Sequence, residues 1–200
     1  MSEKPILFYI SSGHDQNVGG GRKDPGAVSG NFIEADLARK CCNYLRTYLL
    51  NERMDKEYKV AYPERNKDGM HLYEHVAEIN EYRKRFRTVS IDWHFNAGGG
   101  KGCECWIDKD NKYSYELAKM VLTDQKAIGR PWHSYNGKMG PAIHKDSMLQ
   151  FLKAGGVVLL FEAGYVDGKE DRKDFDTDKE LKEIAEAFGK SLIRYYEKYK

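Results

Sequence analysis

The sequence predicts an α/β fold: a single domain built on a twisted, mostly parallel sheet with helices on both faces. Three short apolar runs, at residues 6–11, 88–95 and 157–161, are typical of strands buried on both sides. Longer segments between and after them repeat apolar residues every three or four positions, as amphipathic helices do. Alternating strands and helices imply right-handed crossovers, which place helices on both faces of the sheet.

One domain accounts for the whole chain. Of its 200 residues, 40% are hydrophobic, which is enough to bury one substantial core. No internal repeat, low-complexity tract or linker divides the sequence. We therefore predict one domain over residues 1–200.

The first elements follow in order from the N-terminus. Residues 6–11 form the first predicted strand, and residues 13–30, rich in Gly, Asp and Asn, form a loop. Residues 32–51 have helical spacing, with Asn31 as the expected N-cap. Glu34 then lies in the first turn, where the helix dipole favours a carboxylate.

The next two elements are a short strand at residues 58–62 and a helix at residues 70–86. We expect Leu72, Val76 and Ile79 to face inward from this helix. The remaining predicted elements, in chain order, are a strand at 88–95, a strand at 102–107, a helix at 113–129, a loop at 130–142, a short helix at 147–154, a strand at 157–161 and a helix at 177–199.

Composition excludes some classes of function. The formal net charge is only +2 and no Lys/Arg-dense stripe is interleaved with aromatic residues, so we expect no nucleic-acid binding. No apolar run is long enough for a signal peptide or a membrane span, so we expect synthesis in the cytoplasm without membrane insertion. The four cysteines lack the spacing of a zinc or redox motif, and we expect them to be reduced packing residues.

Residues with metal chemistry gather at the predicted strand ends. His14 follows the first strand, His94 is near the end of the strand at 88–95, and Glu162 ends the strand at 157–161. In open α/β sheets, functional residues collect at the carboxyl ends of the strands. Each of these residues alone would pass as a packing or surface residue, so the prediction depends on their shared placement.

Two imidazoles and one carboxylate form a ligand set typical of catalytic zinc. His14, Glu34 and His94 would supply this set and hold one Zn²⁺. A further carboxylate that is not a ligand is then needed to move a proton, and Glu162 is the candidate. Since an apolar run precedes Glu162, we expect burial to raise its pKa. The sequence therefore predicts a zinc hydrolase.

Local motifs carry a resemblance to a known family. They are Gly13-His14, Asp24-Pro25-Gly26-Ala27, Glu34, His94-Phe95-Asn96-Ala97 and Glu162-Ala163-Gly164, in this order. Over roughly residues 5–198, the chain resembles the zinc-dependent N-acetylmuramoyl-L-alanine amidases of the type-3 family, found in bacterial cell-wall hydrolases and phage endolysins.

The resemblance implies hydrolysis of the amide that joins the lactyl group of N-acetylmuramic acid to L-alanine in peptidoglycan. It implies that His14, Glu34 and His94 are the zinc ligands and that Glu162 is the catalytic glutamate. Asn96 matches a family position near the metal, with a substrate contact or a supporting role as the expectation.

The chain departs from the family in places. Asp92-Trp93-His94 stands where the family commonly has Ser-Ile-His, and we expect Asp92 to face away from the site. His71 and His75 are four residues apart, but no third ligand is near, so we expect them at or near the surface. His133 and His144 flank a loop that contains Gly and Pro. One of them is a candidate for lining the substrate groove, without a metal role.

Two alternatives stay open. A zinc exopeptidase or deacylase acting on a small amide would need the same residues, and a catalytically silent cell-wall binding module would need none of the chemistry. For the amidase, we expect peptidoglycan as partner, a monomer, and no separate wall-binding domain. A phage or prophage endolysin, released to the cell wall at lysis, fits the lack of a signal peptide, as does a spore-associated amidase.

Overall fold

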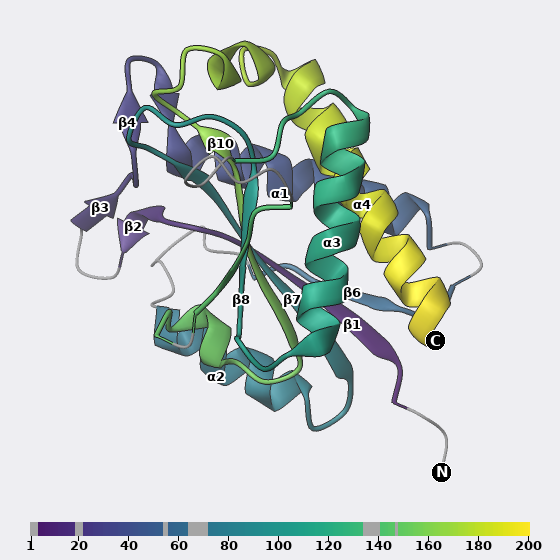
Figure 1. Cartoon of the computed structure of the whole chain (residues 1–200). Helices are drawn as coiled ribbons and strands as arrows, with labels where there is room; N and C mark the ends of the chain where they lie inside the picture. The colour runs from purple at the N-terminus through teal and green to yellow at the C-terminus, as the bar shows by residue number, and fades with distance from the viewer. Residues whose placement is uncertain (1–3, 19–21, 54–55, 64–71, 134–140, 147) are drawn as a thin grey trace.

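The computed structural model describes residues 4–18, 22–53, 56–63, 72–133, 141–146 and 148–200. Within them, six strands form the main sheet in the order β6-β1-β7-β10-β8-β9 (Figure 1). Their bounds are β1 Ile6–Ser12, β6 Lys59–Ala61, β7 Arg87–Asn96, β8 Glu104–Ile107, β9 Ile143–Lys145 and β10 Val157–Tyr165. β6, β1, β7 and β10 are parallel to one another, whereas β8 pairs with β10 in the antiparallel direction. The predicted α/β domain with a mostly parallel sheet is confirmed.

Helices cover both faces of the sheet. The α-helices are α1 Glu34–Asn51, α2 Leu72–Tyr82, α3 Lys112–Ala127 and α4 Asp178–Tyr199, and two short 3-10 helices are η1 Phe151–Lys153 and η2 Asp171–Asp174. Residues of α1, α3 and α4 share one large apolar core with the sheet, and residues of α2 and η1 share a smaller core on the other face. None of the helices in the described ranges is both long and apolar enough to cross a membrane.

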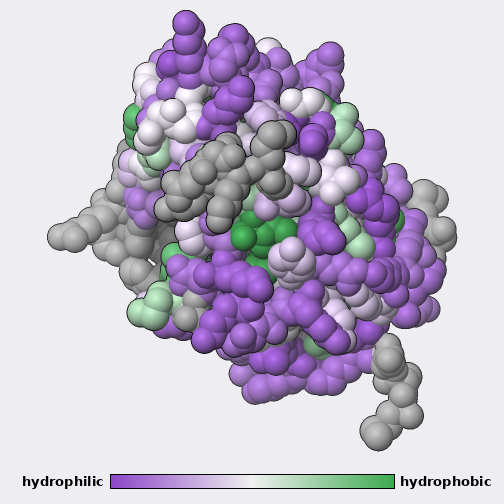
Figure 2. Space-filling model, viewed as in Figure 1, coloured by the Kyte–Doolittle hydropathy of each residue, from purple (hydrophilic) through white to green (hydrophobic). Residues whose placement is uncertain are grey.

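The face of the molecule drawn in Figures 1 and 2 is mostly polar. Figure 2 shows the molecule from the same side as Figure 1. The surface seen there is largely hydrophilic, with a compact hydrophobic patch near its centre. The apolar side chains of the two cores are packed between the helices and the sheet.

Alternation along β7 divides its residues between the two faces. Ile91, Trp93 and Phe95 belong to the large core. Because side chains alternate along a strand, Asp92 and His94 lie on the opposite face, toward α2. α2 and η1 pack there against the residues of the smaller core, such as Val158 of β10. The face toward α2 therefore carries the polar residues of the central strands.

The entry to α1 differs from the prediction. The helix begins at Glu34, and Phe32–Ile33 forms a short strand, β5, paired with β4, Val28–Ser29. Asn31 is therefore not the N-cap; Ile33 occupies that position without a side-chain cap. Loop carbonyls take over this role, since the amide of Glu34 donates to the carbonyl of Ala27 at 2.9 Å.

Several other local predictions need correction. The predicted loop at residues 13–30 contains an antiparallel ribbon of β2, Asp15–Val18, and β3, Arg22–Asp24. On α2, Leu72 is 42% exposed, whereas Ile79 is buried as expected. Where a short helix was predicted at 147–154, the described residues contain only the 3-10 helix η1, Phe151–Lys153. The strand β9 was not predicted. All four cysteines are free and buried, as expected.

Candidate metal centre and catalytic carboxylate

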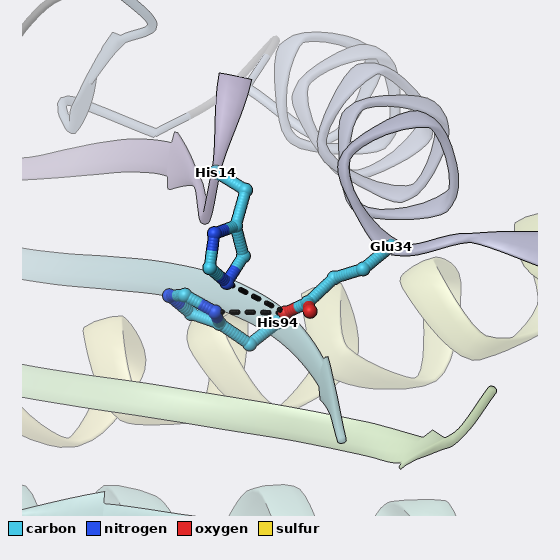
Figure 3. Close-up of side chains that lie close together, drawn as sticks. All are labelled: His14, Glu34 and His94. Carbon is cyan, nitrogen blue, oxygen red and sulfur yellow. Dashed lines mark hydrogen bonds and ion pairs between the residues drawn. The ribbon is translucent and has the colours of Figure 1, made fainter. Parts of the chain in front are cut away.

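Three elements bring His14, Glu34 and His94 together. His14 lies in the loop after β1, Glu34 is the first residue of α1, and His94 is near the carboxyl end of β7. One ligand atom from each lies within 4.8 Å of the other two. Figure 3 shows the three side chains pointing toward one another. His14 has a φ of 55°, and this left-handed conformation turns its side chain toward Glu34.

Glu34 stands between the two imidazoles. Its Oε1 lies 3.0 Å from Nδ1 of His94 and 3.4 Å from Nε2 of His14. A tetrahedral zinc ion with bonds of about 2.0 Å needs ligand atoms roughly 3.3 Å apart. Both distances and the two-histidine, one-carboxylate donor set therefore fit a zinc ion.

The carboxylate of Glu34 is fixed by the backbone. Oε2 accepts a hydrogen bond from the amide of Ala27 at 2.8 Å, and Oε1 accepts one from the amide of Phe95 at 3.1 Å. The residue is only 4% exposed. Folding therefore sets the orientation of this donor before any ion binds.

Each imidazole also contacts a second carboxylate. Nδ1 of His14 lies 3.0 Å from Oδ1 of Asp24, and Nε2 of His94 lies 3.1 Å from Oδ2 of Asp92. The expectation that Asp92 faces away from the site is wrong, because residues two apart in a strand share a face. In each histidine, one ring nitrogen therefore faces Glu34, and the other contacts an aspartate, Asp24 for His14 and Asp92 for His94.

The cluster shifts the pKa values of its members. Burial raises the pKa of Glu34, but hydrogen bonds from His14 and His94 outweigh it and lower this pKa to about 2. The hydrogen bond with Glu34 raises the pKa of His14. Burial lowers the pKa of His94, yet the charge of Asp92 and its hydrogen bonds raise it well above its usual value. Each of these shifts favours the charged form, because the carboxylate of Glu34 and the two imidazoles are paired in a buried cluster.

Two glycines make room for the cluster. A Cβ on Gly26 would lie 2.5 Å from Oε2 of Glu34 and 2.6 Å from Cδ2 of His14. A Cβ on Gly13 would lie 2.1 Å from Cε1 of His94. Gly26 also has a φ of +65°, which glycine adopts most readily. The glycines of the Gly-His and Asp-Pro-Gly motifs are therefore sites of close approach.

Glu162 lies beside the cluster. It pairs in register with His94 on β7 and with Glu104 on β8. Burial, followed by the charge of Glu34 and Glu104, raises the pKa of Glu162 to about 7, although the charge of His94 lowers it. Its Oε2 is buried and has no hydrogen-bond partner among the described residues. A carboxyl group with these properties can gain and lose a proton near neutral pH.

Asn96 does not point at the three candidate ligands. Its Nδ2 donates to Oε1 of Glu104 at 2.9 Å, and its Oδ1 accepts from the amide of Ala97 at 2.8 Å. Both side-chain atoms of Asn96 are therefore hydrogen-bonded within the protein. The amide braces the end of β7 against β8.

Glu104 is a polar residue of this region that the sequence analysis missed. It is 3% exposed, and its carboxylate also contacts Nε1 of Trp106 at 3.3 Å and Nε2 of His144 at 3.0 Å. Its alternation with Cys103 and Cys105 in a predicted strand was visible in the sequence. Its place beside Glu162 was not, because that depends on the antiparallel pairing of β8 with β10.

The other histidines among the described residues lie outside the cluster. His75 is fully buried, against the expectation of a surface or half-buried position, and its Nδ1 lies 2.6 Å from the hydroxyl of Tyr9. His71 is not among the described residues. Nδ1 of His133 lies 3.1 Å from the carbonyl of Lys101. His144 contacts Glu104 and stacks on Trp106 with ring centroids 4.4 Å apart.

A comparison with known protein families identifies one that matches nearly the whole chain. A sequence model described as N-acetylmuramoyl-L-alanine amidase matches residues 9–194. No curated protein matches the chain in sequence.

Solved structures of similar fold include three amidases from different bacteria. The N-acetylmuramyl-L-alanine amidase of Mycobacterium smegmatis is 17% identical, with a TM-score of 0.80, covering 98% of this chain and 100% of that one. The N-acetylmuramoyl-L-alanine amidase of Clostridium difficile is 19% identical, with a TM-score of 0.78 and full coverage of both chains. That of Nostoc punctiforme is 20% identical, with a TM-score of 0.75, covering 98% and 99%. At these identities the likeness shows a shared fold.

Proposed function

Because this chain belongs to the N-acetylmuramoyl-L-alanine amidase family, we propose that it is a zinc-dependent hydrolase of peptidoglycan. The bond cleaved would be the amide between the lactyl group of N-acetylmuramic acid and L-alanine of the stem peptide. The observation that carries this proposal is the convergence of His14, Glu34 and His94 on one point, with Glu162 on the adjacent strand.

We propose His14, Glu34 and His94 as the residues that hold zinc. Their donor types and separations support this assignment, as does a partner carboxylate behind each imidazole. When bound, zinc supplies Lewis acidity toward the scissile carbonyl and lowers the pKa of a water molecule. With only three protein ligands, the site would leave a position open for water or substrate.

Glu162 moves the proton in this proposal. Its carboxylate takes a proton from the attacking water as the oxygen–carbon bond forms at the amide carbonyl. The resulting carboxyl group then delivers this proton to the nitrogen of L-alanine as the carbon–nitrogen bond breaks. The pKa of about 7 supports both steps, since the group exchanges a proton at little cost near neutral pH.

The test is an assay of the products released from purified peptidoglycan. The zinc-loaded chain should release free amino termini of L-alanine without new reducing sugars, and a chelator should stop the release until zinc is restored. Glu162→Gln serves as the inactive control, because it keeps the shape of the side chain but cannot carry the proton. Activity that survives complete removal of zinc would overturn the proposed mechanism.

The same assay separates the alternatives. Turnover of short N-acyl peptides without release from peptidoglycan would point to a zinc exopeptidase or deacylase. Binding to peptidoglycan without any product would point to a silent binding module. The retained carboxyl group of Glu162, beside a complete donor set, argues against the silent module.

A further inference from the structure

We propose that Asp92 is a positioning residue that makes His94 a ligand through Nδ1, by accepting a hydrogen bond from its Nε2–H. The inference rests on the proposed function, since it takes His94 as a zinc ligand. Its direct support is the 3.1 Å separation between Oδ2 of Asp92 and Nε2 of His94.

The carboxylate of Asp92 is held in one orientation. Its other oxygen, Oδ1, accepts a hydrogen bond of 2.7 Å from the hydroxyl of Ser11. Ser11 and Asp92 are paired in the register of β1 and β7, so the sheet itself fixes this contact. Asp92 is only 2% exposed, and water cannot readily compete for its oxygens. The position of Oδ2 opposite His94 is therefore set by folding.

A hydrogen bond at Nε2 decides what the other nitrogen can do. When the proton of a neutral imidazole is on Nε2, Nδ1 presents a lone pair, and here it faces Oε1 of Glu34 at 3.0 Å. Two acceptors at this distance repel each other unless a proton or a metal ion lies between them. Asp92 thus turns the gap between His94 and Glu34 into a place for a cation, and the partner carboxylate also raises the basicity of the imidazole.

His14 provides an internal comparison. Its contact with Asp24 has nearly the same length, 3.0 Å against 3.1 Å. The side chain of Asp24, however, is 52% exposed, whereas that of Asp92 is 3% exposed. Because solvent screens an exposed charge, removing the charge of Asp92 should affect metal binding more than removing that of Asp24.

The test compares zinc dissociation constants in competition with a chelator for the full chain and three variants. Asp92→Asn keeps the shape and an acceptor for Ser11 but removes the charge. It should weaken zinc binding by about 10-fold to 100-fold. Asp24→Asn should weaken zinc binding by a smaller factor. Asp171→Asn is the matched control. It removes another buried carboxylate, which accepts from the amides of Gly102 and Tyr165, and it should leave the zinc Kd unchanged.

A second readout separates positioning from general stability. In zinc-loaded protein, nitrogen NMR of His94 should show a proton on Nε2 and the metal on Nδ1, and Asp92→Asn should shift the Nε2–H resonance. A merely structural role would lower the melting temperature equally with and without zinc, as expected for Asp171→Asn. The positioning role predicts that Asp92→Asn chiefly reduces the gain in melting temperature on zinc binding.

The outcomes are distinct. Wild-type protein that binds zinc, with Asp92→Asn binding it within twofold, would refute the role of Asp92 and leave the proposed function standing. Wild-type protein that binds no zinc would refute both. If Asp92→Asn does not fold, Ser11→Ala, which frees Oδ1 without removing the charge, should still weaken zinc binding. An unchanged zinc Kd in that variant would also count against the role.

Discussion

Glu162 on β10 stands opposite His94 on β7, in the register of two parallel strands. Neighbouring strands are about 4.8 Å apart, so the ladder of backbone hydrogen bonds fixes the spacing between the two residues. The proposed proton carrier and a proposed zinc ligand are therefore both on the rigid centre of the sheet. By contrast, His14 lies in the loop after β1, and Glu34 is the first residue of α1.

Replacing Glu162 should separate catalysis from metal binding. In Glu162→Gln, we expect zinc content and fold to be retained and kcat to fall about 10³-fold, because proton transfer by a positioned group contributes about 10² to 10⁴ in rate. The measurements are zinc per chain and release of L-alanine amino termini from peptidoglycan. A variant with near wild-type turnover would show that Glu162 is not the proton carrier.

Replacing His94 should remove the metal. His94→Ala lacks one of three proposed ligands, and we expect it to lose zinc on dialysis together with its activity. His133→Ala is the control, since His133 contacts the carbonyl of Lys101 and lies outside the cluster. Elemental analysis after dialysis measures the zinc content of both variants. Equal zinc content in the two variants would refute the ligand role of His94.

Gly26, the glycine of the Asp-Pro-Gly motif, should be required for zinc binding because a larger residue would clash with Glu34. Gly26→Ala places a methyl group 2.5 Å from Oε2 of Glu34, so we expect weaker zinc binding and lower stability. Gly30→Ala is a close control, because Gly30 has a similar φ of +61° but nothing within 4 Å of the added Cβ. It should cost only about 1 kcal/mol in free energy of unfolding, from backbone strain, and leave the zinc Kd unchanged. Zinc titration and thermal unfolding of both variants decide the point; a similar zinc Kd in both would contradict it.

Zinc should stabilise the protein more as pH rises. The raised pKa values of His14 and His94 give the zinc-free protein stability that is present below pH 6.5 and is lost as these groups deprotonate. The raised pKa of Glu162 adds a loss that begins above pH 4.5 and is complete above about pH 7. Zinc replaces the protons of the cluster and avoids the loss from the two histidines.

The measurement is the melting temperature with and without zinc between pH 5.5 and pH 8. The gain on adding zinc should grow steadily across this range. The lowered pKa of Glu34, about 2, does not affect stability in this pH range. Its contribution to stability is fully present above pH 4.5 and is lost only as the pH falls toward 2. A zinc-induced gain that does not change with pH would contradict the proposed exchange of protons for metal.

The sequence was most informative about the core strands and about the residues that gather in the candidate metal centre. Apolar runs at residues 6–11, 88–95 and 157–161 correspond to β1, β7 and β10, because strands buried on both faces need a continuous apolar sequence. Short elements at the edge were harder. β9 has three residues, and its pairing with β8 comes from tertiary contact rather than from local preference.

The sequence by itself determined the α/β class, the order of the main elements and the placement of His14, His94 and Glu162 at the ends of strands. These features are local, since periodicity and strand ends are readable along the chain. Only the tertiary structure decided that Glu104 lies beside Glu162 and that His75 is buried. The first depends on the direction and register in which β8 pairs with β10, and a one-residue change of register would reverse the face of every side chain. The second depends on how α2 packs against the sheet, where Nδ1 of His75 lies beside the hydroxyl of Tyr9.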